Sequence, residues 1–319
     1  MHRLRDGNLS FPICRGRSAI RVLLLGTAAG GGLPQWNCAC PNCHAARGGK
    51  IPRRTQSSVA VTDGAGHWFL VNASPDLPSQ IETHPDLQPA GGSSRNSPIA
   101  GVLLTNADLD HALGLFSLRE GSRIEIYAPR AVRETLITHL NLAAILESFC
   151  GISWHEPPKT GFAPLGPEGA PTTGLLYRAI ELPGTPPPFA KAAPGAHSVA
   201  YQFTDSRTGG RLLVAPDVAG LNEPLLRALS NSDIILFDGT FWSGDELAGV
   251  KPQAPKATEM GHVTIKDCSL ELLRNLTARQ KILIHINNTN PVLAPESPER
   301  AVAEAAGITI GADGLDFEL

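Results

Sequence analysis

The sequence has few aromatic residues, little net charge and no long apolar segment. Phe, Trp and Tyr make up 5% of the chain, and the formal net charge is −3. A nearly balanced charge argues against a nucleic acid or an anionic membrane surface as the partner. The apolar run Val22–Leu25 is far shorter than a membrane span or a secretion signal requires. We therefore expect no membrane span and a cytoplasmic location.

The chain is long enough to bury a core without disulfide bonds. It has 319 residues, of which 42% are hydrophobic, and this composition is typical of a globular protein. Its 32 Gly and 27 Pro favour many short elements joined by turns. We predict a flexible N-terminal extension over residues 1–19 and a single domain over residues 20–319.

The hydrophobic pattern predicts buried strands mixed with helices in both halves of the chain. A hairpin is expected from Ser57–Thr62 and Trp68–Asn72, the longest helix over Arg130–Leu146, and a terminal strand pair within Thr309–Leu319. Four further strands are predicted, each ending at a polar cluster: Ile99–Leu104, Arg211–Ala215, Asp233–Phe237 and Lys281–Ile286. This order favours sheets sandwiched between helices, an α/β or α+β layer architecture.

Half of the six cysteines lie in one short loop. Cys38, Cys40 and Cys43 have the close spacing of a metal-binding turn, not the spread of a disulfide framework. We predict a structural zinc site with no role in turnover, in a reducing compartment. Three reduced thiols or a redox pair are the alternatives. The fourth ligand stays open among His44, Cys268 and Asn288.

Acidic and imidazole side chains follow several of the predicted strands. Asp108, Asp110 and His111 come after one strand, Asp217 after another and His285 at the end of a third. Asp238 follows a fourth strand, and His262, beside a glycine-containing turn, would either join these groups or cap the helix that begins near Thr264. Such groups at several strand ends are what a metal cleft requires, although singly each is also typical of a helix or turn cap. Asp110, His111 and His285 would form a two-histidine, one-carboxylate set suited to Fe(II), with Zn(II) and Mn(II) as alternatives.

Several separate blocks of the sequence resemble the PqqB family of pyrroloquinoline quinone (PQQ) biosynthesis, from about residue 20 to the C-terminus. The blocks are Leu25–Cys43, Thr105–His111 with Gly114–Glu120, Phe237–Trp242, Met260–His262 and His285–Pro291. This family is similar to the metallo-β-lactamase superfamily, which implies an αββα sandwich of two mixed sheets flanked by helices.

The resemblance also assigns metal positions. The superfamily's first metal motif is Thr-His-x-His-x-Asp-His, and here Asn106 and Asp108 replace its two early histidines. One metal position is therefore altered, whereas the other, carried over as Asp110, His111 and His285, is intact. His197 falls where the middle histidine is expected and Asp217 where the bridging aspartate is expected.

The resemblance implies an Fe(II)- and O₂-dependent hydroxylation of a tyrosine ring in a glutamate–tyrosine precursor of PQQ, with other PQQ biosynthesis proteins as further partners. Asp108 would be an extra ligand or a proton acceptor. Arg119 would bind a substrate carboxylate or pair with Glu120. Amides after the last strand would orient the substrate or satisfy the backbone: Asn287, Asn288 and Asn290. The alternatives are a metal-dependent hydrolase and a non-catalytic carrier that moves PQQ or its precursor towards export.

Overall fold

The structure is a computed structural model that describes residues 20–91, 95–166, 174–191 and 194–319. The predicted extension over residues 1–19 lies outside the described residues. None of the helices in the described ranges is both long enough and apolar enough to cross a membrane.

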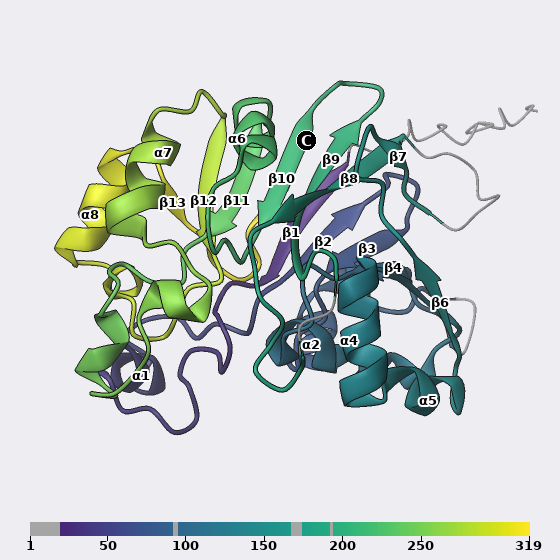
Figure 1. Ribbon diagram of the computed structural model, residues 1–319, viewed down its shortest axis with the longest axis horizontal. Coiled ribbons are helices and arrows are strands. Elements are labelled where there is room, and N and C mark those ends of the chain that lie inside the picture. The colour runs from purple at the N-terminus through teal and green to yellow at the C-terminus, as the bar shows by residue number, and fades with distance from the viewer. Residues whose placement is uncertain (1–19, 92–94, 167–173, 192–193) are drawn as a thin grey trace, which may run out of the picture.

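The strands of the described part of the chain form two seven-stranded sheets (Figure 1). The first sheet has the order β14-β1-β2-β3-β4-β5-β6. Its strands are β1 (Arg21–Gly26), β2 (Ser58–Thr62), β3 (Trp68–Val71), β4 (Ile99–Leu103), β5 (Ile124–Tyr127), β6 (Ile152–His155) and β14 (Asp316–Glu318). The second has the order β13-β12-β11-β10-β9-β8-β7. Its strands are β7 (Ala163–Pro164), β8 (Leu175–Leu182), β9 (Ser198–Asp205), β10 (Arg211–Ala215), β11 (Ile234–Asp238), β12 (Gln280–Ile284) and β13 (Thr309–Ile310).

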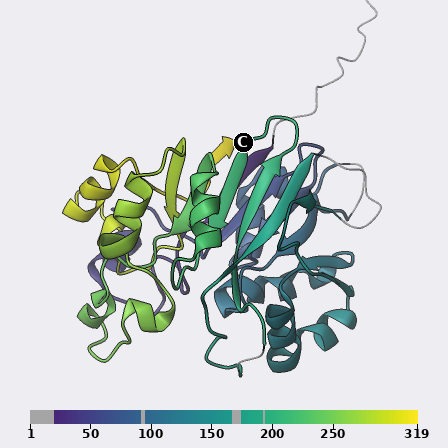
Figure 2. The same ribbon diagram turned by 45° about the horizontal axis from the view of Figure 1, so that its top comes forward.

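Helices cover the outer face of each sheet (Figure 1, Figure 2). The first sheet is covered by α2 (Leu77–Thr83), α4 (Arg130–Leu140) and α5 (Leu142–Glu147), and the second by α6 (Glu223–Ser230), α7 (Leu270–Arg274) and α8 (Pro298–Ala305). Two short helices carry residues of interest below: α1 (Pro41–Arg47) and α3 (Leu109–Ala112).

The side chains of a single strand serve two different cores. In β1, Val22 and Leu24 pack between the two sheets, whereas Leu23 packs against the helices outside the first sheet. In β11, Leu236 faces the other sheet and Phe237 faces the outer helices. This alternation follows from the period of two residues in a strand, and it requires strands that are apolar on both faces. The predicted αββα sandwich is confirmed.

Two sequence-based predictions of secondary structure are wrong, whereas the hairpin of β2 and β3 is confirmed. The segment Arg130–Leu146 is not one helix, because Asn141 takes a left-handed conformation (φ 53°) that separates α4 from α5. The last two strands do not pair with each other: β13 joins β12 and β14 joins β1. Gly311 donates a hydrogen bond to Leu283 and Gly314 to Leu24, so the chain crosses from one sheet to the other there.

The strand ends that matter for function lie at one edge of the sandwich. Strands β10, β11 and β12 are mutually parallel, so their carboxyl ends meet at the same edge. The loop after β1 is joined to the end of β12 by a backbone hydrogen bond from Ala29 to Ile286. Function in such folds is commonly carried on the loops that follow the strands.

Candidate metal centre

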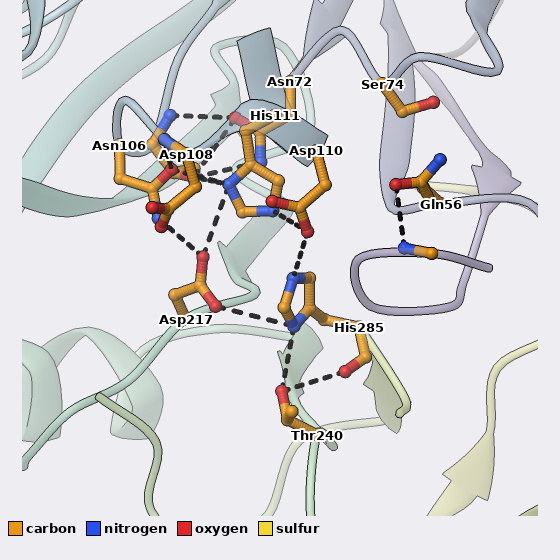
Figure 3. Close-up of polar contacts among 12 residues, drawn as sticks. Gln56, Asn72, Ser74, Asn106, Asp108, Asp110, His111, Asp217, Thr240 and His285 are labelled. Atoms are coloured by element: carbon orange, nitrogen blue, oxygen red, sulfur yellow. Dashed lines mark hydrogen bonds and ion pairs between the residues drawn. The ribbon is translucent and has the colours of Figure 1, made fainter. Parts of the chain in front are cut away.

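Three side chains from two strand ends converge on one point (Figure 3). Asp110 and His111 lie on α3, just after β4, and His285 directly follows β12. His285 Nε2 is 3.2 Å from Asp110 Oδ2, and His111 Nε2 is 3.9 Å from the same oxygen. The three ligand atoms lie within 4.8 Å of one another. A divalent cation fits between atoms at these separations.

The ring of His111 is buried and offers one free nitrogen to this point. Its Nδ1 lies 2.8 Å from Asn106 Oδ1 and 3.3 Å from Asp217 Oδ2. Its Nε2 has no hydrogen-bond partner within the described part of the chain. Nδ1 facing two oxygens is expected to carry the proton, which leaves the Nε2 lone pair directed at Asp110 and His285. A buried nitrogen without a partner is unfavourable unless a cation binds it, so the residues present fit a metal ion.

His285 is held by its neighbours in an unusual backbone conformation. Its φ is 55°, in the left-handed region that few residues other than glycine adopt. Thr240 is in the loop after β11, and its Oγ1 is 2.8 Å from His285 Nδ1. Such strain persists at functional sites where the surroundings hold it.

A second group of possible ligands lies beside the first. Asp217, His262 and His285 also bring one ligand atom each within 4.8 Å of one another. Sequence alone left His262 between the cleft and a cap of the following helical segment. That cap is Thr264, whose side chain accepts a hydrogen bond from Asp267. His262 instead contacts Asp238 Oδ2 through Nδ1 at 2.8 Å, so it belongs to the cleft and not to the cap.

The charges of the cleft favour a bound cation. Burial favours the neutral ring of His285, but the charges of Asp217 and Asp110 outweigh it and raise its pKa to about 10. Burial also opposes the charged form of Asp110, yet His111 and His285 hold the pKa of its carboxyl well below the usual range. Burial raises the pKa of Asp108 to about 7, and the charges of Asp217 and Asp110 act in the same direction. A metal ion would replace the proton of His285 and neutralise these carboxylates.

The three loop cysteines form a separate cluster. The Sγ atoms of Cys38, Cys40 and Cys43 lie within 4.8 Å of one another at the start of α1. Asn288 Nδ2 lies 3.2, 3.5 and 3.3 Å from these three sulfurs in turn. Of the three candidates for a fourth ligand, Asn288 is thus the one at the cluster. His44 is exposed, and Cys268 belongs to no metal-binding group among the described residues.

Comparisons with known proteins identify the family. A Beta-lactamase superfamily domain matches residues 67–286. The coenzyme PQQ synthesis protein B of Rhodopseudomonas palustris is 41% identical over 314 residues, covering 94% of this chain and 100% of that protein. The protein of the same name from Cupriavidus necator is 41% identical over 310 residues, covering 95% and 100%. This chain belongs to the PqqB family.

One solved structure supports membership in the PqqB family, and a second shares the fold. The zinc-bound PqqB from Methylobacterium extorquens superimposes with a TM-score of 0.83 at 34% identity, covering 94% of this chain and 100% of that one. A diphosphatase of the PhnP family superimposes with a TM-score of 0.65 at 20% identity, covering 95% and 98%. The second likeness shows the fold alone.

Several residues that we singled out from the sequence of this PqqB-family member lie elsewhere. Arg119 is exposed, pairs with Glu120 at 3.5 Å and does not line the cleft, so of its two predicted roles the structure shows the ion pair and not the substrate contact. Asn290 is fully buried and donates to the carbonyl oxygens of Gly239 and Thr240, which makes it a support of the loop. His197 is buried but belongs to neither group of ligands among the described residues, so we do not propose it as a ligand.

Both clusters of this PqqB-family chain face one large cavity. It has a volume of about 930 Å³, within the range of small-molecule sites. Cys38 and Cys40 line it together with Asp110 and His285. Asn287, predicted from the sequence to orient a substrate, lines the same cavity. A ligand in this space would touch the cleft and the cysteine loop at once.

Proposed function

We propose that this chain acts in PQQ biosynthesis as an Fe(II)- and O₂-dependent hydroxylase of a tyrosine-derived precursor, a cross-linked glutamate–tyrosine species. The names of its relatives support the pathway. The observation that carries the chemistry is the convergence of Asp110, His111 and His285, with a buried and unpartnered nitrogen on His111. A two-histidine, one-carboxylate set leaves coordination positions free for substrate and oxygen.

Each residue of the cleft has a part in this proposal. Asp110, His111 and His285 would hold the ion, which when bound supplies the activation of O₂ that side chains cannot perform. Asp217 accepts a hydrogen bond from Asn106 and contacts the Nδ1 atoms of His111 and His285, so it would orient both rings. Asp108 lines the cavity and would take the proton of the phenol.

We propose a zinc ion at Cys38, Cys40 and Cys43, with a structural role. The zinc-bound relative from Methylobacterium extorquens supports zinc as a metal of the family. Cys43 is fully buried at the start of α1, where one bound ion would fix the loop against Asn288.

The test is an oxygen-incorporation assay. Protein loaded with Fe(II) under nitrogen is exposed to isotopically labelled O₂, with ascorbate as reductant and a glutamate–tyrosine diamino acid as substrate. Mass spectrometry should find one labelled oxygen atom in the product, and the other should appear in water. Iron-loaded protein that binds the substrate but yields no labelled product would disprove the hydroxylase.

A metal-dependent hydrolase is the second candidate, and one observation favours it. Asp217, His262 and His285 lie next to the first group, and two adjacent ions could together activate a water molecule. Two tightly bound ions and turnover without O₂ would support this function. Stoichiometric binding of PQQ with no turnover would support the carrier.

A further inference from the structure

The cleft opens into two chambers, not one. Beside the cavity of about 930 Å³ lies a smaller one of about 350 Å³. Asp108, Asp217, Met260 and His262 line both. The two spaces therefore meet beside the proposed metal ligands. A ligand that reacts at this junction has room to extend in two directions.

The walls of the smaller chamber suit an uncharged ring. Prolines of the segment before β9 and one later proline line it, together with the flexible side chain of Met260. These prolines are Pro183, Pro186, Pro187, Pro188 and Pro255. No Lys or Arg is found among its described lining residues, whereas Asp108, Asp217 and Glu259 are. A carboxylate would be repelled here, and flat apolar surfaces favour a ring.

Two polar side chains that line this chamber have no hydrogen-bond partner among the described residues. Ser198 lines it and is only 7% exposed, yet its hydroxyl has no hydrogen-bond partner in the described chain. The carboxylate of Asp108 likewise takes part in no hydrogen bond or ion pair with a described residue, although its backbone N–H donates to Asn106. A buried hydroxyl without a partner is unfavourable, and one ligand hydroxyl could bind both Ser198 and the partly exposed carboxylate of Asp108.

The larger chamber differs from the smaller one because a cation lines it. Its carboxylates, those of Asp108, Asp110 and Asp217, lie at or beside the proposed metal site, where a bound ion would neutralise them. Lys251 lines it, together with the side-chain amides of Gln35, Asn37 and Asn287. An ammonium group and amide N–H donors are the partners of a carboxylate. The smaller chamber thus suits an uncharged ring of a ligand, and the larger chamber suits its carboxylate groups.

We propose that the smaller chamber is the phenol subsite, where Asp108 and Ser198 meet the ring hydroxyl, and that the larger chamber binds the carboxylate-bearing arm near Lys251. The proposal rests on the hydroxylase function, because it assigns the two ends of that substrate. It orients the phenol ring with its reacting carbon at the junction, beside Asp110, His111 and His285.

The test uses two fragment probes on the full chain loaded with zinc under nitrogen, so that no turnover occurs. Para-cresol represents the phenol and glutarate the acidic arm, and ligand-observed NMR measures each affinity alone and in the presence of the other. The variants are Ser198→Ala for the smaller chamber and Lys251→Gln for the larger. Thr185→Trp, at the exposed rim of the smaller chamber, fills it without touching the core.

We expect both probes to bind at the same time. Ser198→Ala should weaken para-cresol about 3–10-fold, the effect of one hydrogen bond, and leave glutarate unchanged. Lys251→Gln should weaken glutarate about 2–5-fold and leave para-cresol unchanged. Thr185→Trp should abolish para-cresol binding only.

Competition between the probes, no binding of para-cresol, or equal effects of each variant on both probes would overturn the assignment. A thermal melt of each variant separates these results from misfolding, and Thr185→Trp serves as the second readout for the smaller chamber. The outcome is independent of oxygen chemistry. If the probes separate but no labelled oxygen is incorporated, the hydroxylase fails and the two subsites stand.

Discussion

The cysteine loop and the metal cleft differ in how their ligands are brought together. The three cysteines lie within residues 38–43, so a single turn at the start of α1 collects them. Asp110 and His285 are separated by 175 positions and meet only because strands of two different sheets end at the same edge. Local chain geometry builds the first cluster, whereas the whole sandwich builds the second.

The two regions nevertheless share one segment of the chain. His285 belongs to the cleft, and Asn288, three residues later, contacts the three sulfurs. Asn42, between the cysteines on α1, donates to the carbonyl oxygens of Asn288 and Asn290. The two ligand sets are therefore distinct, but the loop that follows His285 contacts both, so a change at one set could reach the other. The predictions below test how far they are.

The largest effect is expected from His111→Ala. Removing a buried ligand should empty the cleft of its ion and leave the cysteine-bound ion in place, because no cysteine contacts His111 in the described structure. Elemental analysis of purified protein measures both ions. His139→Ala, an exposed histidine on α4, is the matched control and should keep both. Loss of both ions from His111→Ala would show that the two sets are one unit.

Cys40→Ala should give the converse result. It should lose the cysteine-bound zinc and lower the free energy of unfolding by more than about 4 kcal/mol, as loss of a structural metal can. Zinc content and thermal melting measure this. Cys150→Ala, at a half-buried cysteine outside the cluster, should change neither. Unchanged zinc and unchanged melting in Cys40→Ala would reject the site.

Glu246→Gln tests the segment that both regions share. Burial raises the pKa of the Glu246 carboxyl to about 7, although hydrogen bonds from Thr289 and the Trp242 backbone oppose the shift. The folded pKa exceeds the unfolded value of about 4.3. The unfolded chain therefore loses this proton first, and stability falls as pH rises between the two values.

Gln at position 246 has no carboxyl group that can titrate. Relative to Glu246→Gln, the native chain should lose up to about 3 kcal/mol between about pH 4 and pH 7. Urea unfolding of both proteins across this range measures the difference. A constant difference across the range would mean that the Glu246 carboxyl has the same pKa in the folded and the unfolded chain.

Thr240→Val should have the smallest effect and should be confined to the cleft. It removes the hydroxyl beside His285 Nδ1 with little change of volume, so affinity for the cleft ion should fall about 10–100-fold. Metal titration of both sites measures it, with Thr208→Val in an exposed turn as the control. A fall in affinity at the cysteine site as well would mean that the loop after His285 transmits the change.

The strands were predictable where the pattern of residues is local. The hairpin of β2 and β3 follows from two apolar runs around a glycine-rich turn, and the structure pairs these runs, with Val59 opposite Val71. The pairing predicted for the last two strands was wrong, because a hydrophobic pattern does not specify which sheet a strand joins. Asn141 was missed since its left-handed conformation depends on the packing of α4 and α5.

For the site, the sequence shows which groups follow strands but not which way they point. His285 and Asp110 were selected correctly as neighbours, and they lie 3.2 Å apart. For Arg119 the sequence left two roles open, a substrate contact or an ion pair with Glu120, and its side chain lies at the surface with Glu120. Asp238 and His262 each lie inside a matched block, but the sequence assigned neither as a ligand; in the structure they pair at 2.8 Å.

By itself, the sequence determined the cysteine cluster, the alternating apolar strands and the family, because each depends on residues close together in the chain or on matched blocks in order. Only the tertiary structure decided that Asn288 faces the sulfurs, that His262 joins the cleft and that two chambers meet at Asp108. The reason is physical: side-chain direction and enclosed space depend on how the two sheets and their loops pack, which spacing along the chain does not encode.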